Sequence, residues 1–158
     1  MSEEHIITDS YQRRVSYLRF SVTDRCNLHC VYCRSDGPEE FIPHEDVLRY
    51  EEIIRLVRIA RSMHVNKVRL TGGEPFARRD FDKLLLGLRE NFPDLNLRIT
   101  SNGTLMGPHI PVLKQARINA VNLSIDSFRP ETFARVTGHD LLGKVTETLD
   151  ALLDAGIR

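Results

Sequence analysis

Strand-like and helix-like patterns alternate along almost the whole chain, and this alternation is the strongest constraint on its fold. Segments that alternate polar and apolar residues predict strands, and each is followed by apolar residues at helical spacing. The predicted strands are 16–23, 67–71, 95–101 and 120–125, and the predicted helices are 50–60, 81–92 (capped by Asp80), 110–116 and 145–153. Repeated strand–helix units favour right-handed βαβ connections and one parallel sheet. We therefore predict an α/β fold, a partial (β/α) TIM-like barrel of four βα units.

The two ends of the chain set the predicted domain limits. Residues 1–14 form a polar N-terminal arm, and residues 15–158 form the barrel domain without an internal linker. The last helix is expected to stop at Gly156, because a glycine commonly follows the last helical residue. A fifth strand should begin there, whereas the sequence ends at Arg158. We expect a truncated barrel whose open strand edge favours self-association, for example as a homodimer.

One face of the predicted sheet is polar in all four strands. The positions opposite the apolar face are Arg19 and Ser21, Arg69 and Thr71, Arg98 and Thr100, and Asn122, Ser124 and Asp126. An unpaired charge inside a protein costs on the order of several kcal/mol, so these arginines need water or anionic partners. This favours a wide, wet lumen around a negatively charged ligand. Two simpler alternatives are an open sheet with one solvated face and an ion pair between an arginine and Asp126.

All three cysteines lie in one short polar loop after the first predicted strand, at Cys26, Cys30 and Cys33. An odd number of cysteines this close together disfavours a disulfide framework and favours metal or redox chemistry. A four-iron cluster needs one ligand per iron, so three thiolates would leave one iron open to a small-molecule chelator. Spacing alone equally allows a structural zinc site with His29 or His44 as the fourth ligand.

Composition and the strand ends narrow the choice of function. The formal net charge is +0, which gives no global reason to expect a nucleic-acid or membrane partner. The first five residues are acidic and lack the features of a signal peptide, and no apolar stretch could span a bilayer, so we predict a cytoplasmic protein. Polar or glycine-rich motifs follow every strand, and active sites of α/β enzymes gather at these carboxyl ends.

These motifs together resemble those of radical S-adenosylmethionine (SAM) enzymes. The resemblance rests on C-x3-C-x2-C with Tyr32 before the last cysteine, and on Gly72-Gly73-Glu74-Pro75 after the second strand. Residues 17–27, 67–75 and 122–126 are most similar to the GTP 3′,8-cyclase family of molybdenum-cofactor biosynthesis. Family members commonly continue Met-Pro after the third cysteine, whereas this chain has Arg34-Ser35. The resemblance covers nearly all of the chain but only about the first half of the expected family length.

The resemblance implies a role for particular residues. Cys26, Cys30 and Cys33 would ligate a [4Fe–4S] cluster, and Tyr32, Gly73 and Ser124 would contact SAM. Arg19, Arg69 and Thr100 would contact GTP, and all three lie on the polar face described above. We assign Gly72-Gly73-Glu74-Pro75 to the SAM amino group, with Glu74 as an acceptor and Gly73 allowing a close approach or a sharp turn.

The implied reaction is a radical SAM lyase reaction. An electron-donor protein would reduce the cluster, SAM would yield a 5′-deoxyadenosyl radical, and GTP would cyclise to (8S)-3′,8-cyclo-7,8-dihydroguanosine 5′-triphosphate. The family also has a second [4Fe–4S] cluster, in a C-terminal half that is absent here. We therefore expect this truncated chain to bind a cluster but to carry out little or no complete GTP cyclisation alone. One alternative is another radical SAM enzyme, either peptide-modifying or an activase. A second is a non-catalytic, zinc-stabilised fragment.

Overall fold

The fold is a four-stranded parallel sheet covered by helices, which confirms the predicted α/β class. The computed structural model describes residues 6–33 and 41–158, so the first five residues of the predicted arm and Arg34-Ser35 lie outside it. The strands are β1 (Tyr17–Ser21), β2 (Lys67–Thr71), β3 (Asn96–Ser101) and β4 (Ala120–Leu123). They lie in the order β1-β2-β3-β4 and all pair in parallel.

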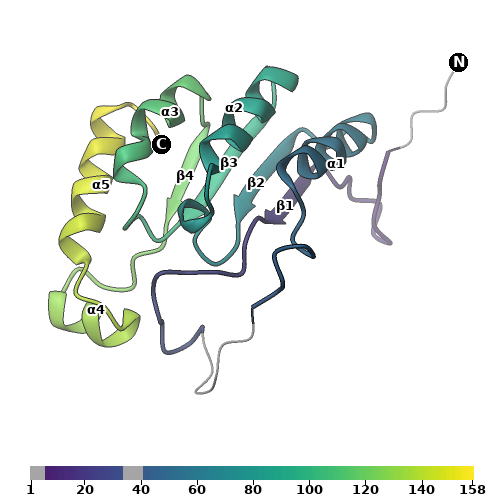
Figure 1. The fold of residues 1–158 in the computed structure, drawn as a ribbon. Coiled ribbons are helices and arrows are strands. Elements are labelled where there is room, and N and C mark those ends of the chain that lie inside the picture. The colour runs from purple at the N-terminus through teal and green to yellow at the C-terminus, as the bar shows by residue number, and fades with distance from the viewer. Residues whose placement is uncertain (1–5, 34–40) are drawn as a thin grey trace, which may run out of the picture.

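Helices follow the strands and bury the apolar side of the sheet. They are α1 (Tyr50–Ser62), η1 (Pro75–Ala77), α2 (Phe81–Asn91), η2 (Gly107–His109), α3 (Ile110–Gln115), α4 (Pro130–Thr137) and α5 (Leu142–Asp154). Figure 1 shows α1, α2 and α3 along one face of the sheet, with α5 beyond β4. Val68, Leu70, Leu97 and Ile99 point into this core and are fully buried. The predicted parity of the strands is therefore correct, because the polar positions lie on the opposite face.

The structure differs from the prediction at two helix starts. Helix α4 was not predicted; it begins at Pro130 and its one fully buried apolar residue, Phe133, packs with Leu142 and Val145 in a small second core. Asp80 does precede α2, but its φ of 61° is left-handed and its side chain makes no capping bond. Its carboxylate lies 3.3 Å from Lys83 Nζ instead, so Asp80 occupies the predicted cap position without the expected side-chain capping bond.

The chain returns to the outer edge of β4 at its end. Gly156 has φ 70° and follows α5 as predicted, and the Arg158 carbonyl accepts a hydrogen bond from Val121 N at 2.6 Å. None of the helices in the described part of the chain is long and apolar enough to cross a membrane.

Candidate functional site

The carboxyl ends of the strands enclose a cavity of about 200 Å³, which we call the strand-end cavity. Its walls come from the loop after β1 and from the ends of β2, β3 and β4. The lining residues are Cys26, Leu28, Cys30, Tyr32, Cys33, Thr71, Gly72, Gly73, Thr100, Ser101, Asn102 and Ser124. The three cysteines, the three residues assigned to SAM and Thr100 therefore share one cavity. Arg19 and Arg69 lie on the same face of the sheet but do not line it.

The glycine pair after β2 packs directly against the chain that leads to the cysteines. Gly73 N donates to Thr23 O at 2.7 Å, and Glu74 N donates to Arg25 O at 2.8 Å. A Cβ on Gly73 would lie 2.2 Å from Arg25 O, and one on Gly72 would lie 2.3 Å from Thr23 O. The close approach expected at Gly73 thus exists, but it is made to protein backbone, and it fixes the start of the cysteine loop.

Helix α4 holds the other side of the cysteine loop, which runs below the strand ends in Figure 1. His29 N donates to Thr137 O at 2.9 Å, and Val31 N donates to Val136 O at 3.0 Å. The last carbonyls of a helix lack partners within it, so the loop amides satisfy groups that α4 leaves open. Sequence reasoning missed this support, because the only signals were Pro130 at the helix start and Gly138 after its end.

Within the described residues, none of the three cysteines forms a disulfide. Burial, opposed in part by a hydrogen bond from Tyr32, raises the pKa of Cys30, so this thiol keeps its proton at neutral pH until a metal displaces it. Among residues 6–33 and 41–158, no three Cys, His, Asp or Glu side chains already converge at metal-binding distances. Three cysteine thiols fit an iron–sulfur cluster in kind and number. Their sulfur atoms must move closer to one another when metal binds.

The two histidines considered as zinc ligands lie elsewhere. His29 Nδ1 is 3.3 Å from His139 Nε2, and the two exposed rings pack at a centroid distance of 5.5 Å. Neither His29 nor His44 lines the strand-end cavity. The structure therefore brings no fourth zinc ligand from this pair into the cavity.

Glu74 has a different role from the one predicted. Its side chain is fully buried, and its carboxylate accepts hydrogen bonds from Ser101 Oγ (2.9 Å), Asn102 N (2.8 Å) and Phe76 N (3.1 Å). Burial raises its pKa despite these three donors. The assignment of this carboxylate to the SAM amino group is wrong. Its oxygens instead accept hydrogen bonds from Ser101 and Asn102, which lie at the end of β3 and in the turn after it.

Three arginines form a row across the polar face of the sheet. Arg19 pairs in register with Arg69, and Arg69 pairs with Arg98. Within the described residues none of them forms an ion pair; Arg69 lies over the Tyr17 ring and Arg98 Nε donates to Asn96 Oδ1. Asp126 accepts the Tyr32 hydroxyl at 3.0 Å, so the predicted alternative of an arginine–Asp126 pair is not observed.

Among the described residues, two buried polar atoms on this face have no hydrogen-bond partner, Arg69 Nε and Thr100 Oγ1. Buried donors are rarely left unpaired in native proteins, since each costs about 1–3 kcal/mol. A ligand with several acceptor oxygens would satisfy both atoms and would also offset the repulsion within the arginine row.

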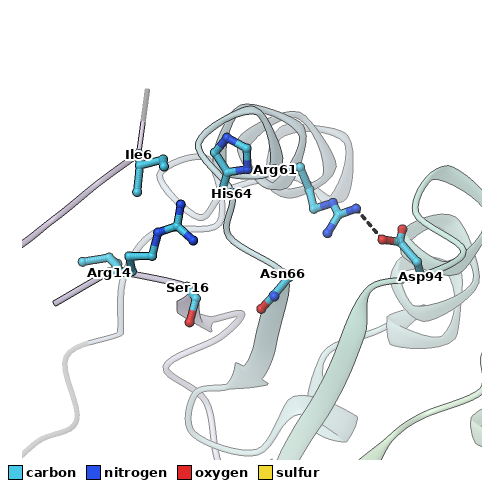
Figure 2. Close-up of a pocket in the computed structure, with 8 residues that line it drawn as sticks. Ile6, Arg14, Ser16, Arg61, His64, Asn66 and Asp94 are labelled. Carbon is cyan, nitrogen blue, oxygen red and sulfur yellow. Dashed lines mark hydrogen bonds and ion pairs between the residues drawn. The ribbon is translucent and has the colours of Figure 1, made fainter. Parts of the chain in front are cut away.

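A second cavity, of about 410 Å³, lies near the opposite ends of β1 and β2. Figure 2 shows Arg14 and His64 at this cavity, with Arg61 paired to Asp94 at 2.6 Å. None of the predicted site residues lines it. Residues at this end of a barrel usually serve stability rather than catalysis.

Comparisons with curated proteins find relatives that match nearly the whole chain. A GTP 3′,8-cyclase of Nautilia profundicola is 41% identical over 153 residues, which are 97% of this chain and 48% of that protein. One of Pelotomaculum thermopropionicum is 41% identical over 150 residues, 94% of this chain and 46% of its own length. The chain thus spans about half the length of the curated relatives it matches.

Solved structures support the same fold. The crystal structure of Streptococcus suis SuiB has a TM-score of 0.73 at 19% identity, covering 90% of this chain and 31% of SuiB. That of anSMEcpe with bound AdoMet has a TM-score of 0.69 at 22% identity, covering 90% and 40%. The profile of the radical SAM superfamily matches residues 20–158. This chain therefore belongs to the radical SAM superfamily.

Proposed function

We propose that this chain carries the SAM-cleaving site and part of the GTP site of a GTP 3′,8-cyclase, a lyase of molybdenum-cofactor biosynthesis. The observation that carries the proposal is the strand-end cavity, where three cysteines meet Tyr32, Gly73, Ser124 and Thr100 beside the arginine row. The relatives named GTP 3′,8-cyclase support the choice of substrate.

The cysteines would each hold one iron of a [4Fe–4S] cluster. When bound, the cluster and SAM supply a 5′-deoxyadenosyl radical, which the proposed reaction uses to take the C3′ hydrogen of GTP so that C3′ can attack guanine C8. Tyr32, Gly73 and Ser124 would keep SAM in the strand-end cavity. Together with the cysteines, these residues line the same cavity of about 200 Å³.

Arg19, Arg69 and Thr100 would bind GTP from the polar face. Arginine suits this task because its planar fork of donors matches phosphate oxygens. The Arg69 Nε and Thr100 Oγ1 atoms, which lack partners on the described chain, have donors to offer. The proposal further includes a cytoplasmic location and an electron-donor protein. We also propose that the protein forms a homodimer. The second [4Fe–4S] cluster of the family would be held by residues outside this chain.

The first test is anaerobic reconstitution with iron and sulfide, followed by dithionite, SAM and an assay for 5′-deoxyadenosine. We expect product from the unmodified chain and none from Cys30→Ala. A chain that takes up zinc without iron or sulfide would refute the proposal.

The second test measures GTP binding by equilibrium dialysis. Loss of one charge-assisted contact costs roughly 1.5–3 kcal/mol, so Arg69→Gln should weaken binding about 10- to 150-fold. Arg58→Gln is the matched control, because Arg58 is exposed on α1, away from the strand-end cavity, and donates to Asn91 Oδ1. Equal affinities of the two variants would argue against the assigned GTP contacts.

A further inference from the structure

A compact hydrogen-bond network joins the cysteine loop to the turn after β3. Asn27 Nδ2 donates to Thr104 Oγ1 at 2.8 Å, and Asn102 Nδ2 donates to Asn27 Oδ1 at 3.0 Å. Asn102 Oδ1 in turn accepts from Thr104 N at 3.0 Å and from Thr104 Oγ1 at 2.7 Å. Every polar atom of the three side chains therefore has a partner, which makes the network rigid.

This network fixes which way the Asn102 amide points. A backbone N–H can only donate, so the atom facing Thr104 N must be the Asn102 oxygen. The Asn102 nitrogen consequently faces the cysteine loop. One of its two hydrogens is used by Asn27 Oδ1, and the other points to Cys26 Sγ, 3.7 Å from Nδ2.

Asn102 is itself held by a buried group. Its backbone N donates to Glu74 Oε2 at 2.8 Å, and the same carboxylate holds Ser101 Oγ. The Asn102 side chain therefore projects from the end of a core strand rather than from a free loop. Glu74, through this bond, fixes the position of a donor to a cysteine sulfur.

We propose that Asn102 is a positioning residue that orients Cys26 and raises the reduction potential of a cluster bound there, through an N–H···S hydrogen bond. The inference rests on the proposed function, because it requires Cys26 to be a cluster ligand. Reduction adds negative charge that is shared by the ligand sulfurs, so a donor to sulfur stabilises the reduced cluster more than the oxidised one. Cys26 Sγ also accepts from Leu28 N at 3.5 Å, and this backbone donor stays in any side-chain variant.

The test is a redox titration of the reconstituted chain without SAM, followed by the EPR signal of the reduced cluster. Asn102→Ala removes the donor, and Asn102→Asp replaces it with an oxygen while keeping the shape and the acceptor for Thr104. At a fixed applied potential we expect the reduced-to-oxidised ratio to fall several-fold in Asn102→Ala, about tenfold at most, where tenfold corresponds to 59 mV. Asn102→Asp should fall further, because it also adds negative charge beside Cys26.

Thr104→Val is the matched control, because it breaks the same network but leaves the Asn102 nitrogen next to Cys26. We expect Thr104→Val to keep the potential of the unmodified chain. Normal iron and sulfide content with an unchanged potential in both Asn102 variants would overturn the inference while the proposed function stands. So would a Thr104→Val shift as large as that of Asn102→Ala.

The two proposals fail in different ways. A chain that shows the ordered shifts in potential but does not bind GTP would support the role of Asn102 and refute the GTP assignment. A chain that assembles no cluster at all would overturn both, since neither can hold without cysteine ligation.

Discussion

Gly73→Ala should destabilise the fold strongly, because the site of the missing Cβ is filled by backbone. An alanine Cβ would lie 2.2 Å from Arg25 O, 2.5 Å from Arg25 C and 2.8 Å from Asp24 O. Relief requires a movement of about 1 Å between the two loops, and overpacking of this kind costs about 1–3 kcal/mol. The movement also stretches the hydrogen bonds of Gly73 N and Glu74 N, each worth about 0.5–1.5 kcal/mol. After the small gain from a stiffer unfolded chain, we expect a net loss of about 2–4 kcal/mol.

The measurement is urea unfolding followed by circular dichroism, with Gly143→Ala as the control. Gly143 lies in α5 with nothing within 4 Å of its Cβ position, so alanine there should stabilise by up to about 1 kcal/mol. Because residues 24 and 25 lead into Cys26, Gly73→Ala should also take up less iron. A Gly73→Ala chain within about 0.5 kcal/mol of the unmodified one would show that the two loops are not rigidly packed.

Three further predictions test other parts of the structure. Arg89 is buried and donates to the carbonyls of Ala116, Pro93 and Arg117 at 2.7–2.9 Å; Arg89→Met should cost about 3–5 kcal/mol in urea unfolding, whereas a loss below about 1 kcal/mol would contradict its role. Burial raises the pKa of Tyr50 from 10.0 to about 12, so its contribution to stability is complete below pH 10 and is lost as the pH rises through 12. The free energy of unfolding should therefore decrease less between pH 9 and pH 11.5 in Tyr50→Phe than in the unmodified chain. Equal decreases in the two chains would contradict the raised pKa of Tyr50. Arg98 lies directly opposite Arg69 on the neighbouring strand, where the two positive charges repel, so Arg98→Gln should stabilise the free chain by a few tenths of a kcal/mol. The same variant should weaken GTP binding in dialysis. A variant that is more stable and binds GTP at least as tightly, or one that is less stable and binds GTP more weakly, would argue against a shared anion.

The predictable features of this fold are those written in a local pattern. Strand β2 was predicted residue for residue and the polar parity of Arg69 was correct, because alternation over five residues fixes which side of a strand is buried. The cysteines, Tyr32 and Thr100 were likewise predicted to lie close together, because the carboxyl ends of parallel strands share one edge of the sheet. All of them line the strand-end cavity. Their roles as ligands remain predictions.

The features that sequence reasoning missed depend on distant partners. Glu74 resembled a ligand acceptor in a glycine-rich loop, and its true donors come from Ser101 and Asn102. Asn102 follows a strand that was predicted, but its bond to Cys26 spans 76 positions of sequence. Helix α4 has one fully buried apolar residue, Phe133, so its apolar periodicity is weak and its place is set by the cysteine loop that it supports.

The cysteine loop is therefore shaped by the fold before any metal binds. The glycine pair holds its start, α4 binds the amides of His29 and Val31, and Asn102 contacts the sulfur of Cys26. These supports act on different atoms, so their loss should have different consequences. Removing a proposed ligand, as in Cys30→Ala, should abolish iron uptake with little effect on unfolding of the apo chain, because Cys30 is only partly buried and the substitution leaves the backbone bonds of the loop in place. Removing a support, as in Gly73→Ala, should lower stability and iron uptake together, since the loop then loses the shape that lets three sulfur atoms meet.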